Sequence, residues 1–309
     1  MAFAFLFPGQ GSQSLNMMDG FLDVTVVRET FEEASSVLGQ DLWAMLKAET
    51  PDEINATINT QPLMLTAGVA VWRAWRAAGG ASPSMLAGHS LGEYTALVAA
   101  DALAFADAVR LVRLRASAMQ EAVPSGVGAM AAILGLTDDV IREACATAAQ
   151  GDVVEPVNFN SPGQVVIAGQ RAAVERAMEA CKAAGAKRAL PLPVSVPSHC
   201  ALMRPAAERL SVALADIAIR TPAIDVLHNA DVAAYRDADQ IRDALVRQLF
   251  SPVRWTETVS RMAEDGITLM AECGPGKVLA GLAKRIDSRV KCFALTDAQA
   301  IESARAELV

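Results

Sequence analysis

Cysteine is scarce in this chain, and its cysteines are not spaced as pairs. Only five occur among the 309 residues, and no two of them have the CxxC spacing of a zinc site or a redox motif. Because the number is odd as well as small, no disulfide framework is indicated. Reduced thiols are typical of cytoplasmic proteins, and we therefore expect a cytoplasmic location.

A basic excess and a membrane-spanning run are also missing. The chain has 27 Lys and Arg residues against 35 Asp and Glu residues, which argues against a nucleic-acid-binding protein. The N-terminal stretch MAFAFLFPGQ is apolar, but it has no basic start and is interrupted by Pro8. It is too short for a signal peptide or a membrane helix, so we expect no membrane association and predict a buried first strand. We also expect neither a metal nor a cofactor.

Apolar side chains, by contrast, are abundant. They make up 52% of the residues, and charged side chains make up 20%, so a sizeable core is available and disorder is not expected. A chain of 309 residues accommodates one large α/β domain, or a large domain that carries a smaller one.

The N-terminal part alternates predicted strands and helices. Residues 2–7 form a short apolar run that predicts a strand, and helical periodicity follows at 25–38 and 61–78. Residues 84–88 predict a second strand, which leads through a sharp turn into a helix at 93–100. Such alternation favours a mainly parallel sheet in an α/β protein.

Residues 128–194 have a different order of elements. The pattern there predicts a strand, a helix, two strands, a helix and a strand, at 128–135, 137–150, 153–159, 164–169, 171–185 and 188–194. This β-α-β-β-α-β order is the ferredoxin-like split motif. We therefore predict a small ferredoxin-like domain at 126–196, inserted into a larger α/β domain made of 1–125 and 197–309. After the insertion we expect helices at 198–218, 237–250, 254–265 and 277–286, with strands at 223–229, 268–273 and 290–295.

Ser90 is the candidate nucleophile. It lies in GHSLG (88–92), where two glycines permit a tight turn between a strand and a helix and hold the serine side chain exposed. In such a turn the backbone N–H of Leu91 points to the place where an oxyanion would form. A bare GxSxG also arises by chance, but the predicted strand before it and the helix after it favour a nucleophile.

A serine nucleophile needs a base, and the chain has only three histidines. His89 is adjacent to Ser90, and neighbouring side chains on a sharp turn diverge, so we expect it to pack or to hydrogen-bond locally. His228 ends an apolar run and suits a buried structural position. His199 lies where the chain leaves the inserted segment, and a loop at a domain junction is a favourable place for a cleft. By elimination His199 is the candidate base, with capping of a helix start as the alternative.

Arg115 is expected to project into the apolar side of its helix. In residues 105–123 the apolar side chains recur at helical spacing, and Arg115 falls between Ala108 and Leu111 on that side. A buried guanidinium requires an anion. The helix alone leaves two possibilities open, a salt bridge with a protein carboxylate or a clamp for a substrate carboxylate.

The loop GQGSQ (9–13) has no specific interpretation by itself. It lacks the lysine and the spacing of a phosphate-binding loop. Its glycines and Gln10 could bring backbone or amide N–H groups to a ligand, or the segment could be a plain turn after a strand.

Seven motifs are spread over almost the whole chain. They are FPGQGSQ at 7–13, GHSLGEY at 88–94, RLVRLR at 110–115, NFNSPGQ at 158–164, VPSHCALM at 196–203, VRQLFSPVRW at 246–255 and GPGKVL at 274–279. In combination they resemble the acyltransferase family of fatty acid and polyketide synthesis, in particular its malonyl-CoA:acyl carrier protein transacylases. The resemblance implies an α/β-hydrolase-like domain with a ferredoxin-like insertion, in agreement with the element order above.

The resemblance also implies a role for each motif residue. Ser90 would be acylated by malonyl-CoA, with His199 as general base and acid, and Arg115 would hold the free carboxylate of the malonyl group. The N–H groups of Gln10 and Leu91 would form the oxyanion hole, and the backbone carbonyl of Gln248 would orient the histidine. The acyl group would then pass to the phosphopantetheine thiol of acyl carrier protein in a ping-pong reaction.

Three alternatives share these residues. A serine esterase or thioesterase would let water attack the acyl-enzyme, a trans-acting acyltransferase of polyketide synthesis would serve another carrier, and a docking subunit would have no activity. Basic residues at 277–291, or Lys187 with Arg188, could dock an acidic carrier protein. We expect a monomer.

Overall fold

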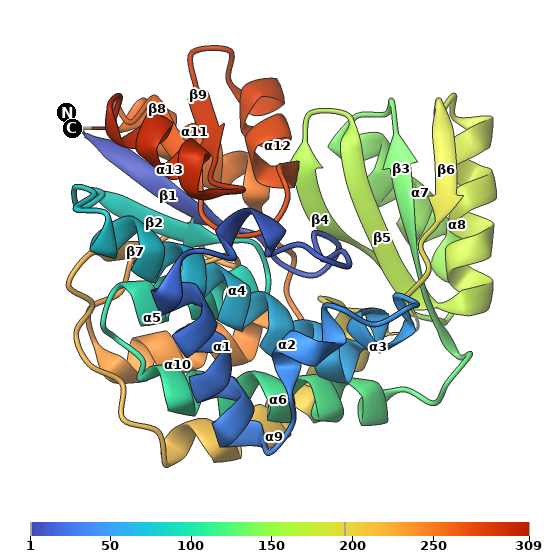
Figure 1. The fold of residues 1–309 in the computed structure, drawn as a ribbon. Coiled ribbons are helices and arrows are strands. Elements are labelled where there is room, and N and C mark those ends of the chain that lie inside the picture. Colours follow the sequence, from blue (N-terminus) through green and yellow to red (C-terminus); the bar gives the residue numbers. More distant parts are fainter. Residues whose placement is uncertain (1, 195, 309) are drawn as a thin grey trace.

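The computed structural model describes residues 2–194 and 196–308, and its larger sheet has five parallel strands. Their order is β7-β2-β1-β8-β9 (Figure 1). The strands are β1 (Phe3–Phe7), β2 (Met85–Gly88), β7 (Asp225–Leu227), β8 (Leu269–Glu272) and β9 (Lys291–Ala294). In register, Phe7 of β1 pairs with Gly88 of β2, and Leu86 pairs with Val226 of β7. The predicted parallel sheet is confirmed.

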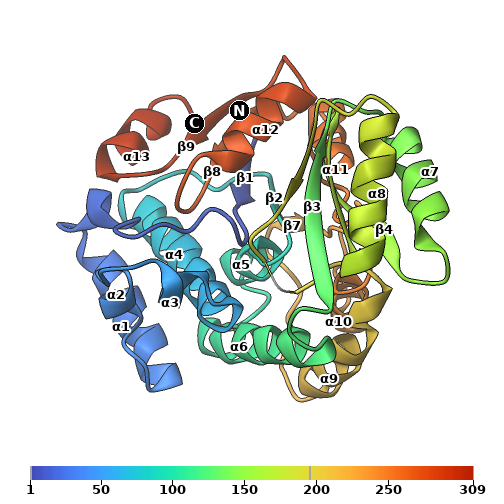
Figure 2. The ribbon, with the colours of Figure 1, turned by 90° about the vertical axis from the view of Figure 1, so that its right-hand side faces the viewer.

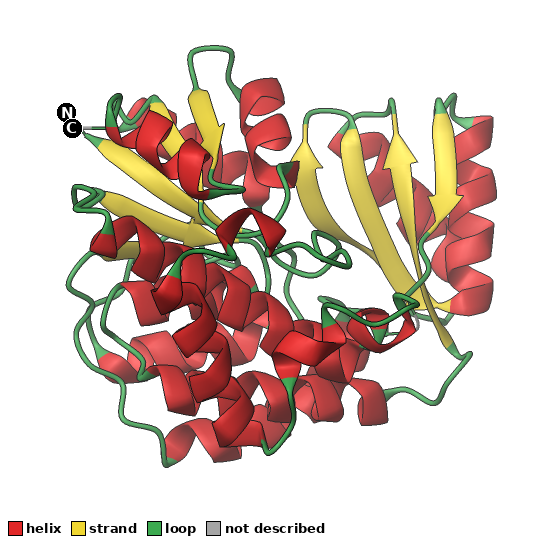
Figure 3. Ribbon diagram, viewed as in Figure 1, coloured by secondary structure: helices red, strands yellow, loops and turns green. Residues whose placement is uncertain are grey.

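Helices cover both faces of this sheet, because the strands bury side chains on both sides. Phe3, Phe5 and Phe7 belong to one large apolar cluster, whereas Ala4 and Leu6 belong to another on the opposite face. This alternation is the two-residue period of a strand, applied here to a sheet buried on both faces. Figure 3 shows the parallel strands surrounded by helices, and the two apolar clusters place these helices on both faces of the sheet.

The helices around this sheet begin and end close to their predicted positions in most cases. They are α1 (Thr25–Leu38), α2 (Leu42–Met45), α3 (Asp52–Asn55), α4 (Thr57–Ala77), α5 (Gly92–Ala99), α6 (Phe105–Ala122), α9 (Arg204–Ala215), α10 (Ala238–Gln248), α11 (Trp255–Glu264), α12 (Val278–Ile286) and α13 (Ala298–Arg305), with short 3-10 turns η1 (Asp19–Phe21) and η2 (Ala201–Met203). The sequence reading missed α2, α3 and α13, and it placed the start of α4 four residues too late.

The predicted helix at 198–218 was wrong at its start. His199 has φ +66°, a left-handed conformation that a helix cannot contain, so the chain first forms η2 and α9 begins at Arg204. Pro205 then stands in the first turn of α9, where its missing N–H costs no intrahelical bond. His199 therefore lies in a loop and does not cap α9.

The second sheet is antiparallel, with the order β4-β5-β3-β6. Its elements are β3 (Gly128–Leu134), α7 (Asp138–Ala149), β4 (Val154–Ser161), β5 (Gln164–Gln170), α8 (Arg171–Ala183) and β6 (Arg188–Pro191). Helices α7 and α8 pack on one face of it around a separate apolar cluster (Figure 2). The predicted β-α-β-β-α-β order is confirmed, although β6 ends at Pro191, short of the expected 194. The domain boundaries at 126 and 196 stay a prediction.

The arrangement of the parallel strands brings distant loops together. Because β1, β2 and β7 are parallel neighbours, their carboxyl ends lie at one edge of the sheet. Gln10 follows β1, Ser90 follows β2 and Asn229 follows β7 at this edge. The fold therefore assembles a site from three segments that are far apart in the sequence.

Candidate active site

Ser90 occupies a strained turn between β2 and α5. Its φ is +50°, a conformation that is uncommon for residues other than glycine. The flanking glycines are required by close packing, since a Cβ on Gly88 would lie 1.9 Å from the carbonyl carbon of Gly92, and one on Gly92 would lie 2.0 Å from the carbonyl oxygen of Phe7. The predicted strand, sharp turn and helix are therefore all present.

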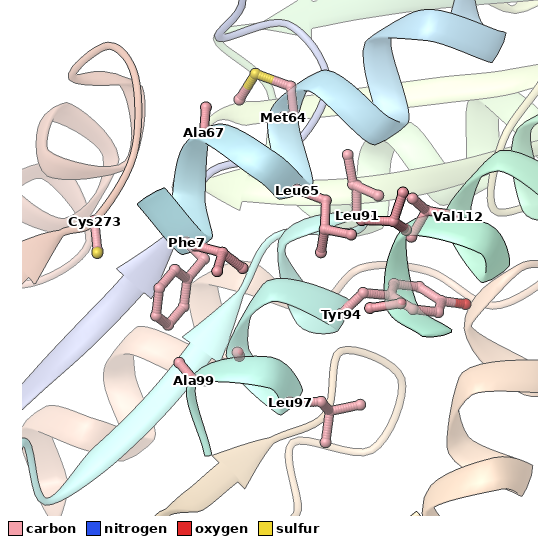
Figure 4. Packing of buried hydrophobic residues seen from close by; sticks show 14 of the residues in the cluster. Phe7, Met64, Leu65, Ala67, Leu91, Tyr94, Leu97, Ala99, Val112 and Cys273 are labelled. Atoms are coloured by element: carbon pink, nitrogen blue, oxygen red, sulfur yellow. The ribbon is translucent and has the colours of Figure 1, made fainter. Parts of the chain in front are cut away.

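The helix after the serine is anchored by buried side chains. Leu91 and Tyr94 pack in the large apolar cluster beside Leu65 of α4 and Val112 of α6 (Figure 4). Leu91 is 1% exposed and Tyr94 is fully buried. This packing fixes the start of α5 and with it the position of the serine turn.

His199 is the histidine that reaches Ser90. Its Nε2 lies 2.7 Å from Ser90 Oγ, and its Nδ1 lies 2.8 Å from the backbone carbonyl oxygen of Gln248. The carbonyl can only accept a hydrogen bond, so Nδ1 carries the proton and Nε2 faces the serine as an acceptor. This is the geometry of a serine and its general base, with a carbonyl in the place of a triad carboxylate.

The other two histidines have different surroundings. His228 is buried, with Nδ1 2.7 Å from a carboxylate oxygen of Glu93. His89 packs beside the ring of Trp255, as expected, but its side-chain hydrogen bond is not local, because its Nε2 lies 2.9 Å from Oδ1 of Asn160 on β4, in the second sheet. Neither forms a hydrogen bond with Ser90 Oγ in the described part of the chain.

The surroundings of His199 keep it neutral. Burial, followed by the nearby positive charge of Arg115, lowers the pKa of His199 to about 3. A neutral imidazole is the form that can accept the serine proton. At neutral pH His199 is therefore in the form in which an imidazole can act as a base.

Arg115 lies beside the serine in an apolar wall. Arg115 is 1% exposed. Its Nη1 donates to Oε1 of Gln61 at 2.8 Å, and its Nη2 donates to Oε1 of Gln248 at 3.1 Å. Nη2 is also 3.4 Å from Ser90 Oγ, and the guanidinium lies 5.5 Å from the centre of the Tyr94 ring. Burial lowers the pKa of Arg115, because the charged form is desolvated.

No carboxylate forms an ion pair with Arg115 within residues 2–194 and 196–308. Its Nε, which is buried, has no hydrogen-bond partner there either. Of the two possibilities that the sequence left open, the salt bridge with a protein carboxylate is therefore contradicted. A buried guanidinium held by neutral groups is suited to bind an anion that enters the site.

A cavity of about 480 Å³ opens onto these groups. Gln10, from the loop after β1, lines it together with Ser90, Leu91, Arg115 and His199. In the described residues the backbone N–H groups of Gln10 and Leu91 donate to no protein group, so both are available to a ligand. The wall opposite the sheet is made by residues of the second sheet and the segment after it, such as Met130, Asn158, Leu192 and Val194.

Three residues at the site were not singled out from the sequence. Gln61 contacts Arg115, and Asn229 contacts the backbone N–H of Ser90. Glu93 contacts Asn229 and Gln248. Gln61 and Asn229 belong to segments that read as ordinary buried elements, and no local pattern marks them. Glu93 carried a signal, since a carboxylate in the otherwise apolar start of a buried helix requires partners.

The described residues contain neither a candidate metal site nor a candidate membrane-spanning helix. No group of three or more His, Cys, Asp or Glu side chains is placed to hold a metal ion in the ranges 2–194 and 196–308. None of the helices in these ranges combines the length and the apolar character that crossing a bilayer requires.

Several known proteins are similar to this chain in sequence and in fold. The chain is 58% identical over 303 residues to the malonyl CoA-acyl carrier protein transacylase of Escherichia coli K12, and the match covers 98% of each chain. The solved structure of the malonyl CoA-acyl carrier protein transacylase from Coxiella burnetii superposes with a TM-score of 0.98 at 50% identity, covering 100% of this chain and 98% of that one.

A second solved structure contains a carrier protein. It is a malonyl-transacylase in complex with its type II PKS acyl-carrier protein, with a TM-score of 0.98 and 55% identity over 99% of this chain and 100% of that one. The family model for the acyl transferase domain matches residues 4–301. Since the match spans nearly the whole chain, this protein belongs to the acyl transferase domain family.

Proposed function

We propose that this protein transfers the malonyl group from malonyl-CoA to the phosphopantetheine thiol of an acyl carrier protein, and so supplies extender units for fatty acid synthesis. One observation supports the malonyl group in particular. The guanidinium of Arg115 is buried 3.4 Å from Ser90 Oγ and has no carboxylate partner among the described residues. An acyl group with its own carboxylate supplies the missing anion.

The first half-reaction acylates Ser90. His199 Nε2 takes the proton from Ser90 Oγ, and the oxygen attacks the thioester carbonyl carbon of malonyl-CoA. The oxyanion of the tetrahedral intermediate accepts from the N–H groups of Gln10 and Leu91. The intermediate collapses with cleavage of the carbon–sulfur bond, and His199 gives its proton to the departing sulfur of coenzyme A.

The second half-reaction repeats these steps in the opposite direction. The carrier thiol gives its proton to His199 and attacks the malonyl-serine carbonyl, and the ester bond to Ser90 Oγ breaks as His199 returns the proton to that oxygen. Throughout, Arg115 holds the malonyl carboxylate, and Gln248 orients His199 through its carbonyl. The kinetics follow a ping-pong pattern, because coenzyme A leaves before the carrier thiol enters the same site.

The test is the intact mass of the protein after brief mixing with malonyl-CoA, with acetyl-CoA as the comparison and Ser90→Ala as the control. We expect a malonyl adduct that requires Ser90 and disappears when carrier protein is added. Free malonate without a lasting adduct would establish the hydrolase instead, and the absence of both adduct and turnover would overturn the proposal.

A second candidate acceptor is the carrier protein of a type II polyketide synthase. The solved relative in complex with such a carrier is 55% identical to this chain, so the chemistry of this site is compatible with either carrier. Transfer rates to the two purified carriers, compared in the same assay, distinguish the pathways.

The proposed docking surface for the acidic carrier combines the two basic clusters found in the sequence. Lys187 and Arg285 line one surface pocket, although Asp138 and Asp139 line it too. Within 277–291, Arg289 pairs with Asp287 and Lys291 pairs with Glu307, whereas Lys277, Lys284 and Arg285 form no ion pair with another described residue. These free charges on and beside α12, together with Lys187, are available to a carrier.

We propose that the protein acts as a monomer. A monomer suffices, because every residue of the proposed mechanism comes from one chain. We propose a cytoplasmic location, supported by five free cysteines, of which four are buried.

A further inference from the structure

We propose that Glu93 is a positioning residue for acyl transfer: it holds the two residues, Asn229 and Gln248, whose side chains fix the backbone of Ser90 and, through Gln248, the guanidinium of Arg115. The part of this inference that concerns malonyl transfer rests on the proposed function. Glu93 does not touch the cavity, and the mechanism above gives it no role.

Three N–H groups converge on the Glu93 carboxylate, which is fully buried. His228 Nδ1 donates to Oε1 at 2.7 Å, the backbone N–H of Asn229 donates to Oε2 at 2.9 Å, and Gln248 Nε2 donates to the same Oε2 at 3.0 Å. His228, Asn229 and Gln248 are themselves at most 1% exposed. The carboxylate is therefore the common acceptor of a buried network.

Two members of this network hold the serine backbone. Asn229 Oδ1 accepts from the Ser90 N–H at 2.7 Å, while its Nδ2 donates to the carbonyl of Gly88 at 2.7 Å. Gln248 Nε2 donates to the carbonyl of Ser90 at 2.8 Å. Both polar backbone groups of Ser90 are thus bound by side chains of residues that Glu93 holds, Asn229 through its backbone N–H and Gln248 through its side chain. A positive φ at a residue other than glycine is strained and persists only where the surroundings fix it.

The same network orients the arginine. The two amide hydrogens of Gln248 are taken by Ser90 and Glu93, so its Oε1 must face Nη2 of Arg115. Without the acceptor at Glu93, the Gln248 amide loses the partner that sets its orientation. The backbone carbonyl of Gln248 also holds His199, so the serine, the histidine and the arginine share this one support.

The network predicts different effects for two substitutions of similar size. In Glu93→Gln, the amide oxygen can replace Oε2 and the NH₂ group can face Nδ1 of His228, because a neutral imidazole can move its proton to Nε2 and accept. In Glu93→Met, the N–H donors of Asn229 and Gln248 lose their acceptor. If Glu93 is a positioning residue, Glu93→Gln must therefore retain the serine reactivity and the malonyl preference that Glu93→Met loses.

The experiment measures two rates at Ser90 in each variant, at a temperature well below the unfolding midpoint of that variant. One is labelling by a fluorophosphonate, which reports serine reactivity without malonyl-CoA; the other is acylation by malonyl-CoA relative to acetyl-CoA. We expect Glu93→Met to lower both the labelling rate and the malonyl preference by about 10- to 100-fold, and Glu93→Gln to stay within a few-fold of wild type. Glu272→Met is the matched control, because Glu272 is a buried carboxylate that accepts from the N–H of Ala280 and contacts none of these residues.

A folded Glu93→Met with wild-type labelling and wild-type selectivity would overturn the proposal, even if its melting temperature falls. Equal losses in Glu272→Met would do the same. If Glu93→Met does not fold, Gln248→Met removes the side-chain link while keeping the carbonyl that holds His199, and unchanged selectivity in that variant would refute the role. Failure of the wild type to react with malonyl-CoA, with normal fluorophosphonate labelling, would refute the proposed function alone and leave the labelling comparison to decide on Glu93.

Discussion

Nη2 of Arg115 lies 3.4 Å from Oγ of Ser90, so the cation and the nucleophile share one end of the cavity. In a malonyl thioester a single methylene separates the carboxylate from the reacting carbonyl. Both groups of such a substrate can therefore engage Arg115 and Ser90 at once, whereas an acetyl group leaves the guanidinium without an anion.

The selectivity of acylation should depend on Arg115. In Arg115→Ala we expect the rate of acylation by malonyl-CoA to fall by about 100-fold or more, because a charge-assisted carboxylate contact is lost, while acylation by acetyl-CoA changes much less. Single-turnover acylation rates with the two thioesters give the ratio. An unchanged malonyl-to-acetyl ratio in this variant would remove the carboxylate clamp from the mechanism.

The pH dependence of acylation should reflect the lowered pKa of His199. With a pKa of about 3, the imidazole stays neutral between pH 7 and pH 5, so kcat/KM should show no loss of base in this range, unlike a histidine that titrates near 6.5. Initial rates across this range test the expectation.

In Arg115→Ala, the loss of activity on acidification should begin at a higher pH than in the wild type. Removing the positive charge eliminates the second cause of the lowered pKa, so the pKa of His199 must rise toward 6.5 and acylation by acetyl-CoA must weaken at a higher pH than in the wild type. Acetyl-CoA is the substrate of choice because it does not need the arginine. Superimposable profiles for the two proteins would contradict the electrostatic coupling.

Charge reversal on α12 should separate the two half-reactions. In the double variant Lys284→Glu and Arg285→Glu we expect transfer to the carrier protein to slow by about 10-fold or more at low salt, with acylation by malonyl-CoA intact. Arg110→Glu with Arg236→Glu is the matched control, since both side chains are exposed and lie away from α12, Arg110 on α6 and Arg236 in the loop before α10. Equal losses in both half-reactions, or in both double variants, would argue against a docking role.

The glycines of the serine turn should be indispensable for stability. A Cβ on Gly88 would meet backbone atoms of Gly92, which cannot move without α5, so Gly88→Ala should destabilise the protein by about 1–3 kcal/mol or more. Gly281→Ala is the control, because nothing lies within 4 Å of its added Cβ in α12, and it should stabilise the helix by up to about 1 kcal/mol. Thermal or urea unfolding provides both values, and a neutral Gly88→Ala would show that the turn is looser than its geometry implies.

The sequence alone determined most of the elements and most of the reacting groups. Two hydrophobic periods, near 3.6 and 2.0 residues, are local properties, so they predicted the alternating helices and strands and the β-α-β-β-α-β insertion before any contact was known. GHSLG pointed to Ser90, and the scarcity of histidine left three candidates for its base.

The tertiary structure decided the questions that depend on distance. Only the parallel pairing of β1, β2 and β7 brings Gln10, Ser90 and Asn229 to one edge, and no periodicity encodes which strands become neighbours. It also showed that His199 reaches Ser90 and that Arg115 contacts neutral amides instead of a carboxylate. Helical spacing could predict that Arg115 is buried, but the identity of its partners depends on residues more than fifty positions away in the chain, which the folded core places beside it.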